Sequence, residues 1–121
     1  MSMHTFQRCA EPGCPSLCFL GGARCLAHQP DPTAATAEAL ALLREEAGAK
    51  DLNAAGMIAE GLDLSRRKFI GCSFIGASFK HILFTGSTFL LCFFDRAYFE
   101  ACDFSGANVQ FGSFGGSEIV N

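Results

Sequence analysis

The chain has 121 residues, half of them apolar, which is enough for one small folded domain. Nine basic against 12 acidic side chains give a formal net charge of -3, so the chain lacks the positive excess of many nucleic-acid and membrane-surface binders. The longest apolar run, Phe89 to Phe94, is far below the roughly 20 residues of a membrane helix. No apolar signal peptide opens the sequence, and we therefore expect a soluble, cytoplasmic protein without membrane contact.

Residues 1–30 hold four of the seven cysteines and too few apolar residues for a core of their own. The spacing is Cys9-x4-Cys14-x10-Cys25-x2-His28. Three thiolates and one imidazole, arranged as two close pairs, suit a tetrahedral zinc ion. Because four protein ligands close the coordination shell, we predict a structural Zn²⁺ site at these residues. The pattern is similar to small treble-clef or ribbon-like zinc modules that are accessories to bacterial proteins.

Two other arrangements of the cysteines stay open. Cys18 lies between the two pairs, so Cys9, Cys14, Cys18 and Cys25 could instead hold an iron-sulfur cluster, which would leave His28 unused. A disulfide framework fits less well, because the number of cysteines is odd and there is no export signal.

Residues 31–61 are expected to form a helical cap or linker. Asp31, Pro32 and Thr33 form a helix-start signal, and Leu40, Leu43 and Ala47 recur at spacings of three and four. With Gly48 as a stop, the pattern predicts a helix over 32–47. One or two further helical turns over residues 52–58 are a weaker expectation, because Gly56 lies within this segment and Gly61 follows it.

From residue 62 to the end the sequence repeats every five residues. Every fifth position is apolar, and a mostly small residue stands two places before it; the apolar positions are Leu64, Phe69, Phe74, Phe79, Phe84, Phe89, Phe94, Phe99, Phe104, Val109, Phe114 and Ile119. This period fits neither a helix nor a long strand, so each unit must be a short extended piece followed by a bend. Repeated bends in one sense produce a solenoid, with the aromatic residues inside and successive coils paired at about 4.8 Å.

The repeat resembles the pentapeptide repeat family, whose units run small residue, Asp or Asn, Leu or Phe, then two variable positions. Cys102-Asp103-Phe104-Ser105-Gly106 and Ala107-Asn108-Val109-Gln110-Phe111 match this pattern closely. The resemblance implies a right-handed, four-sided β-helix with four units per coil, and hence about three coils over residues 62–121. The fold class expected is therefore mainly β, with a zinc module and a capping helix in front of the solenoid.

Stacking of residues twenty apart predicts two surfaces that could meet a partner. Outward positions gather into an apolar patch on one side and around its corner, made of Ile70, Ile75, Leu90, Leu91, Phe93 and Phe111. This patch either lies under the helical segment or the cysteine module, or binds another protein. The end of the solenoid away from the helix is expected to be open, which favours end-to-end association of two copies or a chain that continues in a longer parent.

No phosphate loop, dinucleotide fingerprint or nucleophile with a base is present, so we do not expect an enzyme. The leading hypothesis is a non-enzymatic interaction or scaffold module for a protein partner whose identity the sequence does not give. A second hypothesis comes from the family, some of whose members imitate DNA to regulate type II topoisomerases, although this solenoid is short and neutral. A third is phosphate contact by Arg8, Arg24 and the run Arg66 to Lys68, which the acidic total argues against.

Overall fold

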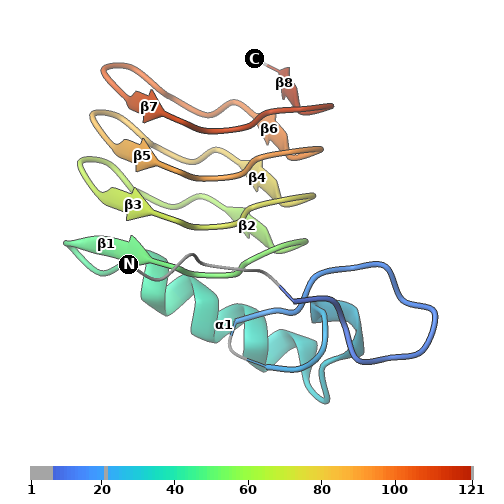
Figure 1. Ribbon diagram of the computed structural model, residues 1–121. Coiled ribbons are helices and arrows are strands. Elements are labelled where there is room, and N and C mark those ends of the chain that lie inside the picture. Colours follow the sequence, from blue (N-terminus) through green and yellow to red (C-terminus); the bar gives the residue numbers. More distant parts are fainter. Residues whose placement is uncertain (1–6, 21, 121) are drawn as a thin grey trace.

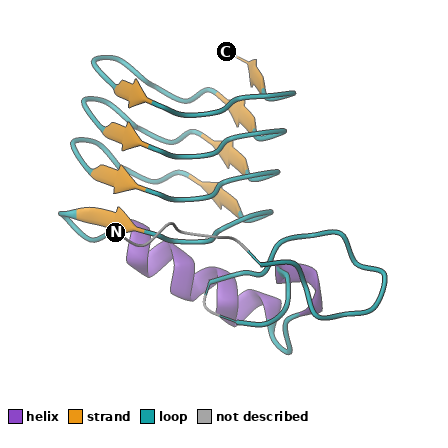
Figure 2. Ribbon diagram, in the orientation of Figure 1, coloured by secondary structure: helices purple, strands orange, loops and turns teal. Residues whose placement is uncertain are grey.

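A computed structural model describes residues 7–20 and 22–120 as a β-solenoid with one α-helix at one end (Figures 1 and 2). Residues 7–20 and 22–30 lie at the same end, and we refer to them as the Cys/His segment. Eight short strands form two parallel sheets of four strands each, ordered β1-β3-β5-β7 and β2-β4-β6-β8, so the solenoid has about four coils. The elements in chain order are η1 (Leu26–His28), α1 (Pro32–Leu43), β1 (Gly48–Lys50), β2 (Ile58–Glu60), β3 (Lys68–Ile70), β4 (Ser78–Lys80), β5 (Thr88–Leu90), β6 (Tyr98–Glu100), β7 (Asn108–Gln110) and β8 (Glu118–Val120).

Strands twenty residues apart pair with one another, so each coil contains twenty residues, as the resemblance to pentapeptide repeats implied. Phe69 pairs in register with Phe89, and Phe79 pairs with Phe99. The two remaining sides are held by single parallel bridges, such as Ser73 to Phe93. Residues twenty apart therefore lie above one another on every side of the coil.

Aromatic side chains fill the interior of the solenoid in columns. Phe69 and Phe89 stack with ring centroids 5.2 Å apart, and Phe79 and Phe99 stack at 5.6 Å. Rings on adjacent sides of one coil meet edge to face, as Phe84 and Phe89 do at 5.4 Å. The expectation that the aromatic repeat forms the buried axis is confirmed for Leu64 and for the phenylalanine at every fifth position from 69 to 99, all of which are buried.

Small inward residues form hydrogen bonds that connect each coil to the one before it. The thiol of Cys92 donates to the carbonyl of Phe69 at 3.3 Å, and the hydroxyl of Ser87 donates to that of Leu64 at 2.6 Å. Cys72 and Cys102 make the same contact to the residue 23 positions earlier. A short side chain with a polar hydrogen thus fits beside each ring and satisfies a carbonyl of the neighbouring coil.

The solenoid begins earlier than residue 62, where the sequence placed its start. β1 and β2 lie within the segment expected to be a helical cap or linker, and the weak expectation of helical turns over residues 52–58 is wrong. The first coil carries Ala49, Ala54 and Ala59 at its central positions in place of phenylalanine. The space is filled from below by Phe19 and by one face of α1, so small residues suffice there.

The helix is confirmed but ends sooner than expected. The side chain of Asp31 accepts a hydrogen bond from the amide of Ala34 at 3.1 Å, and α1 ends at Leu43 rather than residue 47. A turn closed by the amide of Gly48 on the carbonyl of Glu45 leads into β1. Gly48 adopts a φ of +94°, and a side chain there would overlap the Lys68 carbonyl, so this position requires glycine.

Arg67 ties the helix to the second coil. It occupies one of the inward positions that are small elsewhere, and its guanidinium donates to the carbonyls of Arg44 and Glu45 at 3.0 and 3.1 Å. These carbonyls follow the last turn of α1, where a cation also meets the negative end of the helix dipole. An exception to the repeat is therefore explained as a helix cap.

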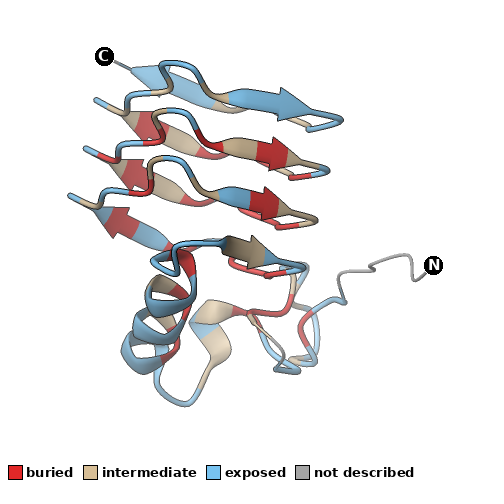
Figure 3. Ribbon diagram, turned by 90° about the vertical axis from the view of Figure 1, so that its left-hand side faces the viewer, coloured by how far each residue is buried: buried red, intermediate tan, exposed pale blue. Residues whose placement is uncertain are grey.

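The opposite end of the solenoid is exposed (Figure 3). In the last coil Val109 is 39% exposed, Phe114 37% and Ile119 62%, although the corresponding residues one coil earlier are buried. In the part of the chain that the structure describes, β7 and β8 are each paired on one side only. Within residues 7–20 and 22–120, no helix has the length and apolar character needed to cross a membrane.

Candidate metal centre and interaction surface

Two local structures bring the predicted metal ligands together. The strand pair formed by Arg8 and Leu17 closes a loop that carries Cys9 and Cys14. Cys25 precedes η1, and His28 ends it. Because side chains three residues apart eclipse one another in a 3₁₀ helix, this short turn places the thiol and the imidazole on the same side.

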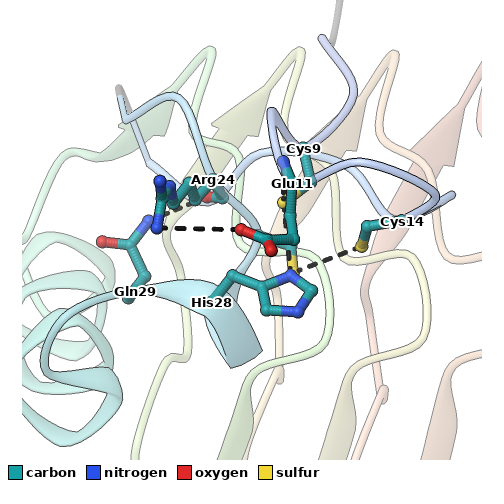
Figure 4. A network of polar contacts seen from close by, with 7 residues as sticks. Cys9, Glu11, Cys14, Arg24, His28 and Gln29 are labelled. Carbon is teal, nitrogen blue, oxygen red and sulfur yellow. Dashed lines mark hydrogen bonds and ion pairs between the residues drawn. The ribbon is translucent and has the colours of Figure 1, made fainter.

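Cys9, Cys14 and His28 lie close together in Figure 4, and Cys25 completes the cluster. Nδ1 of His28 lies 3.4 Å from Sγ of Cys9 and 3.3 Å from Sγ of Cys25, and Sγ of Cys14 lies 3.8 Å from Sγ of Cys25. All four ligand atoms lie within 4.8 Å of one another. Zinc bond lengths give tetrahedron edges of about 3.6 to 3.8 Å between such atoms, so the group is close enough to bind a metal ion.

The electrostatics of the cluster favour a thiolate at Cys9. Burial raises the pKa of this thiol, but the backbone groups of Cys25 and Glu11 and the His28 side chain outweigh burial and hold the pKa at about 6. The Glu11 amide lies 3.5 Å from Sγ of Cys9. At Cys25 burial dominates and raises the pKa, so a metal would have to displace that proton.

The structure separates Cys18 from this cluster. Its thiol is buried and donates to the carbonyl of Arg8 at 3.2 Å. His28, not Cys18, joins the other three ligands. The iron-sulfur alternative, which needed Cys18 and left His28 unused, does not correspond to this arrangement.

Four of the six residues of the predicted apolar patch lie together on the solenoid. Ile70 and Leu90 are register partners in β3 and β5, and Leu91 and Phe111 follow β5 and β7 twenty residues apart. Phe111 is 79% exposed and Leu91 49%, so neither α1 nor the Cys/His segment covers them. We refer to Ile70, Leu90, Leu91 and Phe111 as the apolar patch.

The other two predicted patch residues lie elsewhere. Ile75 is half-buried and lines an open groove with Leu17 and Leu26 of the Cys/His segment, so that segment lies beside Ile75 without covering it. Phe93 is half-buried in the bridge between Ser73 and Ser113 on the adjacent side.

Two residues of the apolar patch have an unusual backbone that sequence reasoning missed. Leu91 and Phe111 both have a φ of +55°, the left-handed region that bulky residues avoid. The equivalent residue one coil before Leu91 is Gly71, with a φ of +65°. The sequence does contain a signal for this: the corner position is glycine at residue 71 but a bulky apolar residue at 91 and at 111, in the next two coils.

The arginines grouped by the sequence for phosphate contact are partly engaged within the protein. Arg24 pairs with Glu11 at 3.9 Å, and Arg67 is held at the end of α1.

In comparisons with protein-family models, curated proteins and solved structures, nothing matched this chain.

Proposed function

We propose that this chain is a non-enzymatic interaction module of the pentapeptide repeat type, in which the apolar patch binds a protein partner. The observation that carries the proposal is the pair Leu91 and Phe111. Each exposes a large apolar side chain from a left-handed backbone, a combination that costs about 1 kcal/mol or more per residue and contributes nothing to the core. Exposed apolar area of this kind is typical of a protein-binding surface.

The Cys/His cluster is proposed to hold a structural zinc ion. Three sulfur ligands and one imidazole suit zinc, and the four protein ligands leave no position for an activated water. The expected result of metal analysis is one zinc per chain, reduced to none by Cys25→Ser. Iron in place of zinc, or no metal in protein purified without chelators, would contradict this assignment.

The patch is tested with glycine substitutions, because glycine removes both the side chain and the strain. We expect the double variant L91G/F111G to stay folded, with its free energy of unfolding changed by less than about 1 kcal/mol. Partner capture from the source cell, identified by mass spectrometry and repeated with the purified partner, should be lost. The matched control is Gly substitution of Ala101, another exposed residue with a left-handed φ of +53° but almost no side chain.

Strong destabilisation of L91G/F111G would show that the two residues serve the fold, and unchanged binding to the purified partner would remove the patch from the proposal.

The exposed last coil supports a second candidate, self-association of two copies end to end. Val109, Phe114 and Ile119 are apolar central residues that no other described residue covers, and β7 and β8 each have one edge that no described strand pairs with. Sedimentation velocity over a concentration series should show a dimer that Ile119→Arg dissociates. A monomer at every concentration would exclude this association.

A further inference from the structure

A groove separates the Cys/His segment from the solenoid, away from the apolar patch. Its volume is about 590 Å³, within the usual range for ligand pockets. Leu17, Leu26 and Ile75 line it and are all half-buried, so its surface is largely aliphatic. One wall comes from the residues around η1, and the other comes from the corners of the first two coils at Ala55 and Ile75.

Two arginines also line the groove, and they reach it from distant parts of the chain. Arg8 belongs to the Cys/His segment, and Arg96 belongs to the third coil. Among the described residues, none of those that line the groove is acidic. In the described part of the chain the ion pair present joins Arg24 to Glu11, so neither groove arginine is neutralised by a salt bridge.

We propose that this groove binds a short peptide segment of a partner protein in which an Asp or Glu flanks an aliphatic or aromatic residue. The inference rests on the proposed function as an interaction module and adds a second, chemically distinct docking site to it. The carboxylate meets Arg8 or Arg96, and the apolar side chain covers Leu17, Leu26 and Ile75. A nucleic-acid backbone would satisfy the arginines but would leave the aliphatic residues uncovered, so the peptide fits better.

The metal centre and the groove share a wall. Cys25 lines the groove and is also one of the clustered metal ligands, and Leu26 and Ala27 follow it in η1. A metal that fixes Cys25 and His28 therefore also fixes the apolar wall between them. We therefore expect removal of the metal to weaken peptide binding, although none of the four metal-binding residues is expected to contact the carboxylate of the peptide.

The test starts with a random heptapeptide phage library panned on the zinc-loaded full chain. The expected result is enrichment of sequences that place Asp or Glu beside Leu, Ile or Phe. An enriched peptide is then labelled with fluorescein, and its Kd is measured by fluorescence polarisation. Arg8→Gln and Arg96→Gln should each raise the Kd by about fivefold, and Ile75→Gln should do so as well.

Arg24→Gln is the matched control, because Arg24 is in the same segment but outside the groove, and its Kd should stay within about twofold of the parent value. The proposal is overturned if no sequence is enriched, if the enriched sequences lack carboxylates, or if Arg24→Gln weakens binding as much as Arg8→Gln. If only L91G/F111G loses peptide binding, the peptide binds at the apolar patch and not in the groove. That result would refute the groove as a binding site but would agree with the proposed function. The proposal would also be refuted if a short DNA duplex displaced the peptide and if this displacement required both Arg8 and Arg96.

Discussion

Replacing the same repeat residue at two heights of the solenoid tests whether the aromatic columns stabilise the fold. Phe89 is fully buried, stacks on Phe69 at 5.2 Å, and meets Phe84 and Phe94 edge to face at 5.4 and 5.3 Å. Phe114 occupies the corresponding position on an adjacent side of the last coil, is 37% exposed, and stacks on Phe94 at 4.9 Å.

The two alanine variants should differ clearly in stability. Phe89→Ala leaves an enclosed cavity and removes three ring contacts, so we expect a loss of about 4 kcal/mol in the free energy of unfolding. At Phe114 about two thirds of the transfer free energy of the side chain is lost and solvent enters the space, which gives about 1.5 kcal/mol. Urea denaturation followed by far-ultraviolet circular dichroism measures both values.

The matched design removes the same atoms in both variants, so the difference reports the burial and the ring contacts of the side chain. Similar losses for the two variants would refute the coil-by-coil account of the core. A loss below about 1 kcal/mol at Phe89 would show that the interior is not packed as described.

Three further predictions concern polar groups. Arg67→Met should lower the free energy of unfolding by about 1 kcal/mol in urea denaturation because the end of α1 loses its cap, whereas Lys68→Met should not, and equal effects would contradict the capping role. Hydrogen bonds from Ser65 and Ser105 lower the pKa of Asp63 and of Asp103, so the stability they contribute is present above the pKa of the unfolded chain and is lost as the pH falls through the lower folded pKa. Thermal melts from pH 6 to about 2 should show the melting temperature falling at the acid end, and replacing both aspartates by Asn should flatten that fall. Cys92 is buried beside Cys72, so 5,5′-dithiobis(2-nitrobenzoic acid) should modify it only after urea unfolds the coil, and rapid modification in native protein would contradict its inward position.

The solenoid was predictable from the sequence because its repeat is regular and aromatic. The phenylalanine at every fifth position from 69 to 99 marks one side of a coil, and no other regular structure gives a period of five. The first coil was missed because its central residues are Ala49, Ala54 and Ala59. Alanine has a high helix propensity, so these residues did not indicate a β-coil. Alanine suffices at these positions because Phe19 and α1 pack beneath them, and this packing is a tertiary contact that the local sequence does not reveal.

The candidate metal ligands were also predictable, since their spacing alone encodes two close pairs. The sequence left open whether Cys18 or His28 completes the set, because that choice depends on the eclipsed geometry of η1. The groove could not be predicted, because Arg8 and Arg96 come together only through the packing of the Cys/His segment against the coils.

The strict twenty-residue register has a consequence for how such a chain can change in length. Inserting or removing twenty residues would add or delete one full storey and leave every face aligned. A change of five would keep the rings inside but rotate everything after it by a quarter turn. Leu91 and Phe111 would then lie on different sides of the solenoid. A deletion of five residues between them would therefore separate the two halves of the binding surface in a protein that still folds.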